Sequence, residues 1–196
     1  MSVFFACMSK LLIINGSPRK NGSDAKVAER AAEIAAEYGY ESEKVDIYDL
    51  RLNGCMACGA CKKTGRCVQK DGMNDLIAKI KDSDMLLLAT PVYYGSETGP
   101  MKTFIDRLYP LSTVNENGEK VRDIGKVKKV STLITCGAPQ GNMTYASLLP
   151  HFISIFKTFG ISDTSGVIIP AADPATVLDS DYTKGYFETL RFQLEH

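Results

Sequence analysis

Short apolar runs alternate with amphipathic stretches along most of the chain. Residues 10–15 (KLLIIN) and 85–90 (MLLLAT) are almost unbroken apolar runs, the pattern of strands buried on both faces. Residues 23–38 place apolar side chains at helical spacing and are followed by a glycine, which favours an amphipathic helix. The full series predicts strands at 10–15, 42–47, 85–90, 129–136 and 166–169, and helices at 23–38, 73–81, 101–109, 144–159 (with Pro150 as a candidate interruption) and within 179–192.

Strands that alternate with helices predict βαβ units and a parallel sheet. Five such strands fit an α/β, flavodoxin-like, doubly wound fold with three layers, an αβα sandwich. In open sheets of this kind ligands bind beyond the carboxyl ends of the strands. The loops expected there are 16–22, 91–99 and 137–142, and the polar stretch 115–125 is expected to be a hairpin or an excursion between elements.

Composition narrows the class of protein. Lys and Arg number 23 and Asp and Glu also number 23, so the zero net charge gives no support for binding to nucleic acid or to a membrane surface. No apolar stretch reaches the length of a transmembrane helix, and the first ten residues lack the basic start of a secretory signal, so a cytoplasmic location is expected. We expect one domain over residues 1–193 and interpret residues 194–196 as a tag remnant.

The loop after the first strand, NGSPRKNGSD, has the composition of an anion site. It matches neither the Walker A nor the dinucleotide fingerprint, but its glycines allow close backbone approach and it leads into a helix N-terminus with free N–H groups. A phosphomonoester suits one short loop and one helix end. The candidate side-chain donors are Ser17, Arg19, Asn21 and Ser23. The alternative is an ordinary strand–helix loop with Ser23 or Asp24 as N-cap, and we assign Asp24 to capping because a carboxylate is a poor neighbour for a phosphate.

The loops after the third and fourth strands could enclose an aromatic ring. Tyr93 and Tyr94 follow a buried strand, and we expect backbone N–H groups of residues 92–96 to reach the ring's polar edge. A flavin needs such a combination. Cys136 and Gly137 would form a third wall. The alternative for the tyrosines is a surface loop that packs on a neighbouring helix or subunit.

Four cysteines, Cys55, Cys58, Cys61 and Cys67, have the spacing C-x2-C-x2-C-x5-C inside a long loop, residues 53–71, after the second strand. Such density in a chain without a secretory signal points to a metal or redox centre before it points to structural disulfides.

Three segments in this order, IINGSPRKNGS, CMACGACKKTGRC and TPVYYGSETGPMKTFIDR, resemble the NADPH-dependent FMN reductase superfamily and, more narrowly, its iron–sulfur flavoprotein branch. The resemblance implies non-covalent FMN, a homodimer or homotetramer, and a [4Fe–4S] cluster on the four cysteines. By the same resemblance Ser17, Arg19, Asn21 and Ser23 would contact the FMN phosphate. The isoalloxazine would be lined by Pro91, Val92, Tyr93, Tyr94, Gly95 and Ser96.

Several alternatives stay open at this point. The thiols could instead hold zinc, be oxidised, or be free. The leading hypothesis is an FMN-dependent oxidoreductase that passes electrons from NAD(P)H or another donor to a quinone, a flavin or another small acceptor, with no catalytic side chain. The second is an electron carrier that serves a ferredoxin without nicotinamide turnover, and the third is a zinc module without flavin. Asp106 and Arg107 are interpreted as a pair at a helix end.

Overall fold

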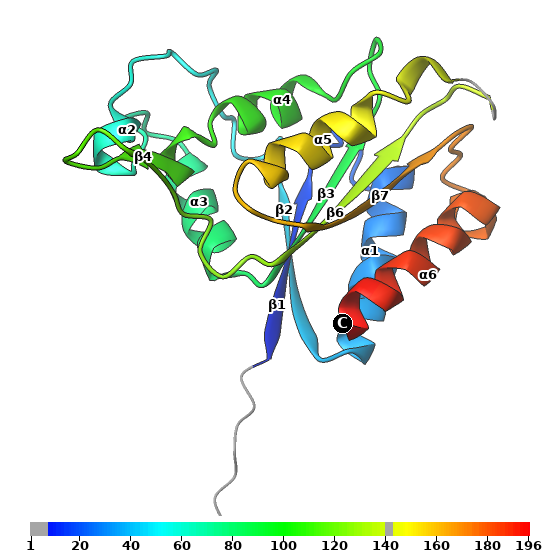
Figure 1. Ribbon diagram of the computed structural model, residues 1–196. Helices are drawn as coiled ribbons and strands as arrows, with labels where there is room; N and C mark the ends of the chain where they lie inside the picture. The colour runs from blue at the N-terminus through cyan, green and yellow to red at the C-terminus, as the bar shows by residue number, and fades with distance from the viewer. Residues whose placement is uncertain (1–7, 140–142) are drawn as a thin grey trace, which may run out of the picture.

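The computed structural model describes residues 8–139 and 143–196. Expectations that fall on residues 1–7, where a secretory signal was rejected, and on residues 140–142, the end of the third loop, lie outside this range. The described chain forms one five-stranded parallel sheet with helices on both faces (Figure 1). The predicted flavodoxin-like α/β fold is therefore confirmed.

The sheet has the strand order β2-β1-β3-β6-β7. Its strands are β1 (Ser9–Asn15), β2 (Tyr40–Asp46), β3 (Met85–Pro91), β6 (Lys129–Thr135) and β7 (Asp163–Ile169). The two edge strands β2 and β7 begin earlier than predicted. Their first residues are mostly polar because a sheet edge faces solvent, so an apolar pattern does not mark where they start.

The helices divide between the two faces of the sheet (Figure 1). Those on one face are α1 (Ser23–Glu37) and α6 (Asp181–Glu195), and those on the other are α3 (Met73–Asp82), α4 (Gly99–Asp106) and α5 (Leu148–Lys157). Short helical turns are α2 (Cys61–Thr64), η1 (Tyr109–Leu111), η2 (Met143–Tyr145) and η3 (Val177–Asp179). No described helix is both long and apolar enough to span a bilayer.

Alternate residues of the central strands enter two separate cores. In β1, Leu12 and Ile14 pack with α3, α4 and α5, whereas Leu11 and Ile13 pack with α1 and α6. Both faces of the strand are buried, which explains its unbroken apolar run.

Two features at the C-terminal side differ from expectation. Helix α5 begins at Leu148, so Pro150 lies in its first turn, where a missing N–H costs nothing, and does not interrupt the helix. Helix α6 runs to Glu195, beyond the expected end of the domain at residue 193. Leu194 is only 6% exposed and packs in the core beside α1, so the folded unit includes residues that we interpreted as a tag remnant.

The polar stretch 115–125 is part of a β-hairpin, which was one of the two structures expected for it. Its antiparallel strands are β4 (Ser112–Val114) and β5 (Lys120–Arg122). The chain then returns to the sheet at Gly125, where the N–H of Lys126 donates to the carbonyl of Lys81 over 3.0 Å.

Gly125→Ala is expected to destabilise the fold by about 2–4 kcal/mol. Gly125 has φ +73°, and a methyl group there would overlap the backbone of Lys81, so strain and a clash add together. The matched control is Gly118→Ala, because Gly118 has φ +80° with nothing near its missing side chain. Urea unfolding should show a clearly smaller loss for the control. Equal losses of unfolding free energy in the two variants would mean that the close approach of residue 125 to the backbone of Lys81 does not contribute to the destabilisation.

Candidate functional site

A cavity of about 210 Å³ lies beyond the carboxyl ends of β1, β3 and β6. The sequence placed twelve candidate residues here. Eight of them line the cavity: Ser17, Arg19, Ser23, Pro91, Val92, Tyr93, Cys136 and Gly137. The other four, Asn21, Tyr94, Gly95 and Ser96, do not line it, and the side chain of Tyr94 is fully exposed.

The first loop is held in shape by the buried side chain of Asn15. Its Oδ1 accepts from the N–H of Ser17 over 3.1 Å, and its Nδ2 donates to Asp46 over 2.7 Å. Ser17 Oγ in turn accepts from the N–H of Arg19 over 3.3 Å. The loop is thus preorganised by its own hydrogen bonds, with Ser17 buried and Arg19 exposed at the cavity.

The start of α1 differs from the expected cap. Gly22 is the N-cap, and neither Ser23 nor Asp24 caps the helix: Ser23 Oγ donates to the carbonyl of Ala172 over 3.2 Å, and Asp24 accepts from Thr135 Oγ1 over 2.6 Å. The first N–H groups of any helix lack helical carbonyl partners, and no N-cap side chain accepts from those of α1. A side chain at Gly22 would crowd Arg19, so the glycine keeps the loop tight against the helix end.

Asp24 is a buried carboxyl on the cavity wall. Burial raises its pKa above the usual value, although the hydroxyl of Thr135 and the charge of Arg19 oppose this. A negative charge is therefore disfavoured at this position even before an anion binds.

The second loop is a tight turn. Tyr93 and Ser96 exchange backbone hydrogen bonds of 2.8 and 3.2 Å, and the residues between them, Tyr94 and Gly95, have φ +49° and +88°. Positive φ at both central residues is the pattern of a type I′ turn. The N–H of Val92 also has a partner, the carbonyl of Thr135 at 2.8 Å. The expectation that all N–H groups from 92 to 96 face a ring is therefore wrong for three of them.

Thr98 joins the first loop to the second. It caps α4 by accepting from the N–H of Met101, and its hydroxyl donates to the carbonyl of Gly16 over 2.7 Å. A side chain at Gly16 would press on Met101 and Thr98, so close contact between the loops requires glycine there. We did not predict this role, although the sequence signal was present: a threonine two residues before a proline marks a helix start.

The third wall is formed by Cys136 and Gly137 together with the loop after β7. The N–H of Cys136 donates to Ile169, and its carbonyl accepts from Ala172, both over 3.0 Å. Burial raises the pKa of the Cys136 thiol. Ala172 and Pro174 also line the cavity and carried no signal in the sequence.

The four clustered cysteines line a second cavity, of about 120 Å³. All four are free thiols, with Cys55 and Cys58 exposed and the other two half-buried. Burial raises the pKa of Cys61, and nearby Cys67, Cys58 and Cys55 raise it further. In the described part of the chain, no three His, Cys, Asp or Glu side chains converge as for a single metal ion.

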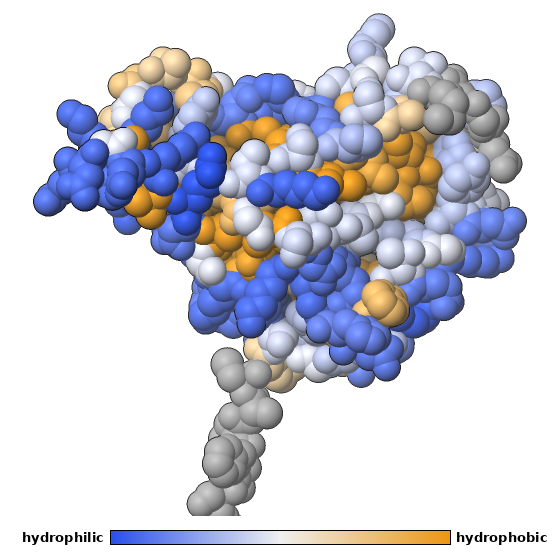
Figure 2. Space-filling model, in the orientation of Figure 1, coloured by the Kyte–Doolittle hydropathy of each residue, from blue (hydrophilic) through white to orange (hydrophobic). Residues whose placement is uncertain are grey.

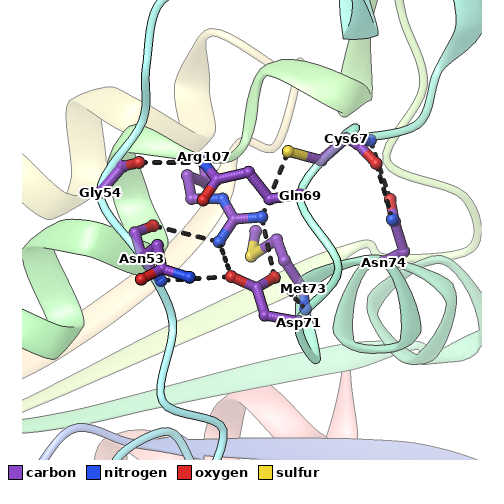
Figure 3. Close-up of polar contacts among 8 residues, drawn as sticks. All are labelled: Asn53, Gly54, Cys67, Gln69, Asp71, Met73, Asn74 and Arg107. Atoms are coloured by element: carbon purple, nitrogen blue, oxygen red, sulfur yellow. Dashed lines mark hydrogen bonds and ion pairs between the residues drawn. The ribbon is translucent and has the colours of Figure 1, made fainter.

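Arg107 is not paired with Asp106, which corrects the interpretation of a helix-end pair. Asp106 forms an ion pair with Lys102, whereas Arg107 is 2% exposed and forms a two-pronged ion pair with Asp71 (Figure 3). Arg107 also donates to the carbonyl of Asn53 over 3.1 Å and to Cys67 Sγ over 3.2 Å. Burial alone would lower the pKa of Arg107, but its bonds to Asp71 and Cys67 outweigh this and raise it.

The turn after β2 contacts the loop after β1. Lys20 in the first loop forms an ion pair of 2.9 Å with Asp49, just after β2. Tyr48 beside it has a raised pKa, chiefly from burial and also from the nearby Tyr93. The hairpin beyond the cysteine loop presents a strongly hydrophilic surface, seen at the left of Figure 2.

A comparison with known protein families identifies the family of this chain. Residues 9–167 match the NADPH-dependent FMN reductase family. The chain belongs to this family. An iron-sulfur flavoprotein from Methanocaldococcus jannaschii is 35% identical over 156 residues, which make up 79% of this chain and 76% of that protein. This places the chain in the iron–sulfur flavoprotein branch, as the sequence motifs indicated.

A second relative, an iron-sulfur flavoprotein from Archaeoglobus fulgidus, is 45% identical over 101 residues. The match covers 52% of this chain and 46% of the relative, so the chain spans about half of that relative's length. Together with the family match, these relatives support an FMN-dependent oxidoreductase at the level of the family.

Solved structures show the same fold at low sequence identity. An NAD(P)H:quinone oxidoreductase from Methanothermobacter marburgensis superposes with a TM-score of 0.73 at 14% identity, covering 96% of this chain and 98% of that one. An FMN-dependent NADH-azoreductase from Bacillus anthracis, solved in complex with FMN, has a TM-score of 0.69 at 17% identity, covering 93% and 98%.

Proposed function

We propose that this protein is an FMN-dependent oxidoreductase that transfers electrons from NAD(P)H or another donor to a quinone, a flavin or another small acceptor. The observation that carries this proposal is the cavity at the carboxyl ends of β1, β3 and β6, where a phosphate-type loop and a tyrosine-bearing turn meet. Such an edge is where open α/β sheets bind ligands, and the family is one of FMN reductases.

The residues present fit FMN. First-turn N–H groups of α1 and the guanidinium of Arg19 would supply donors for the phosphate. Ser17 and Ser23 line the same wall, and their hydroxyls would have to turn from Asp24 and from the carbonyl of Ala172 to donate to it. Asn21, outside the cavity lining, is the least supported of the proposed phosphate contacts.

The flavin ring would lie against the second and third loops. Pro91, Val92 and Tyr93 supply one wall, and Cys136 with Gly137 supplies the other. In the exposed tip of the turn, the N–H groups of Tyr94 and Gly95 are not used in holding the turn closed, so this tip is the proposed source of polar contacts, with Ser96 beside it. When bound, FMN supplies hydride and electron transfer, so we name no catalytic side chain.

We further propose that Cys55, Cys58, Cys61 and Cys67 hold a [4Fe–4S] cluster. Four thiols around one cavity fit a cubane, because its irons stand at separate corners and each takes one thiolate. Burial is the main cause of the raised pKa of Cys61 and the neighbouring thiols add to it, so bound iron would relieve a repulsion that is the smaller part of this effect. A cluster supplies one-electron steps; zinc or free thiols are the alternatives that metal analysis would reveal.

The test of the reductase is anaerobic mixing of the FMN-loaded protein with NADH and with NADPH, followed by addition of a quinone. Bleaching of the flavin by either nucleotide, and its reoxidation by the quinone, supports the proposal. Failure of both nucleotides, with reduction by a reduced ferredoxin, would favour an electron carrier. The four cysteines that line the second cavity, a set suited to a one-electron centre, are the observation behind that second candidate. In either role we propose a homodimer or homotetramer in the reducing cytoplasm.

Asp24→Asn is expected to bind FMN about tenfold more tightly at pH 8, because the variant removes a negative charge beside the phosphate. An amide oxygen can still accept from Thr135. Since the pKa of Asp24 is raised in the fold, its contribution to stability is full below the usual value of 3.8 and is lost as pH rises through the folded pKa. The variant should therefore also gain stability at pH 8 and none near pH 3.

Fluorescence titration with FMN and urea unfolding of the apoprotein, each at both pH values, provide the measurements for Asp24→Asn. A variant that binds FMN more weakly at pH 8 would show that the carboxylate is a ligand contact and not a repulsive neighbour.

A further inference from the structure

Arg107 connects the cysteine loop to the sheet domain through a single buried group. It follows the last residue of α4, and its guanidinium reaches both ends of the segment 53–71 (Figure 3). At one end it donates to the carbonyl of Asn53, and at the other it forms the two-pronged ion pair with Asp71. Asp71 also accepts from the N–H of Asn53 over 3.2 Å, so the two ends of the loop are tied together.

Cys67 is the most firmly held of the four thiols. Its N–H donates to Asn74 Oδ1, and its carbonyl accepts from Asn74 Nδ2, each over 2.9 Å (Figure 3). Arg107 Nη2 donates to its sulfur over 3.2 Å. Backbone and side chain of Cys67 are therefore both fixed by residues outside the cysteine motif, whereas Cys55 and Cys58 are exposed.

We propose that Arg107 is a positioning residue that fixes Cys67 as a cluster ligand and raises the cluster's reduction potential through its N–H···S hydrogen bond. This rests on the proposed cluster. A charged donor on a ligand sulfur stabilises negative charge there, and the reduced cluster carries one more negative charge than the oxidised cluster. The donor therefore favours the reduced state. The bond to Asp71 sets the orientation of the guanidinium and leaves Nη2 aimed at the sulfur.

The test compares variants that keep the fold. Arg107→Met combined with Asp71→Leu removes both buried charges together, so neither partner is left unpaired. Arg107→Lys keeps the positive charge but removes the planar guanidinium, which can donate hydrogen bonds to Asn53, Asp71 and Cys67 at the same time. Lys102→Gln is the matched control, because it removes an exposed cation from α4, the helix that Arg107 follows.

Each protein is reconstituted anaerobically with iron and sulfide, analysed for both, and titrated by EPR-monitored redox potentiometry. We expect the double variant to lower the ratio of reduced to oxidised cluster at a fixed ambient potential about tenfold, or 59 mV for a one-electron couple. Arg107→Lys should shift in the same direction by less, and Lys102→Gln should match the wild type.

Wild-type potentials in both Arg107 variants would overturn the inference while leaving the cluster intact. If the double variant takes up no cluster, Arg107→Lys decides: a lowered potential supports the inference, and an unchanged one overturns it. Failure of the wild-type protein itself to take up iron and sulfide would instead overturn the proposed cluster, and the inference with it.

Discussion

Arg107→Leu alone is expected to lower the free energy of unfolding of the apoprotein by about 3–5 kcal/mol, the usual cost of breaking a buried ion pair from one side. The variant would leave the carboxylate of Asp71 in a site where its side chain is only 6% exposed. It would also remove the bonds to Asn53 and Cys67 that hold the cysteine loop. Urea unfolding under reducing conditions measures the loss.

The double variant, Arg107→Met with Asp71→Leu, is the control for that prediction. We expect it to stay within about 1 kcal/mol of the wild type, because hydrophobic replacement of a buried pair is often neutral or stabilising. A single variant as stable as the double would mean that the buried pair contributes little.

The same pair predicts a pH dependence. Burial would raise the pKa of Asp71, but hydrogen bonds from Arg107, Asn53 and Met73 outweigh it and hold the pKa below the usual 3.8. A lowered pKa in the fold contributes stability that is full above 3.8 and is lost as pH falls through the folded pKa. In acid the wild type should therefore lose this contribution, and the double variant should not.

Arg19→Gln is expected to weaken FMN binding about 10- to 100-fold, the value of a hydrogen bond to a charged group. Riboflavin lacks the phosphate, so its affinity should not change. Arg30→Gln is the matched control, because Arg30 lies on α1 and pairs with Glu33 in solvent. Fluorescence titration of both flavins measures the affinities. Equal weakening for FMN and riboflavin would place Arg19 at the ring or show a general loss of structure, and no change would remove it from the site.

The sheet was predictable because its central strands are buried on both faces and therefore read as apolar runs. The first residues of the edge strands were not, since β7 begins with Asp163, Thr164 and Ser165, and in β2 the buried Tyr40 is followed by an exposed Glu41. The phosphate loop was also recognisable, because glycine, serine and arginine between a strand and a helix have a direct physical use. The cap at Gly22 was missed because the two better capping residues, Ser23 and Asp24, bond elsewhere.

Side-chain contacts between residues far apart in the chain could not be predicted from the sequence. Thr98 meets Gly16 and Arg107 meets Asp71 across 82 and 36 positions in the chain, and periodicity reports burial but not the partner. One signal for Arg107 existed. It lies three residues after the buried Phe104, at the end of the predicted apolar helix, and a cation in line with a buried face requires a partner.

The most direct test of the proposed function is a UV–visible spectrum of anaerobically purified protein, with FMN, iron and acid-labile sulfide determined on the same sample. We expect flavin bands with a broad shoulder, together with about four iron and four sulfide per chain, the content of a [4Fe–4S] cluster. Flavin bands without iron, after anaerobic reconstitution, would contradict the cluster and leave an FMN reductase. A colourless protein that fails to bind added FMN would contradict the proposal that this protein is an FMN-dependent oxidoreductase.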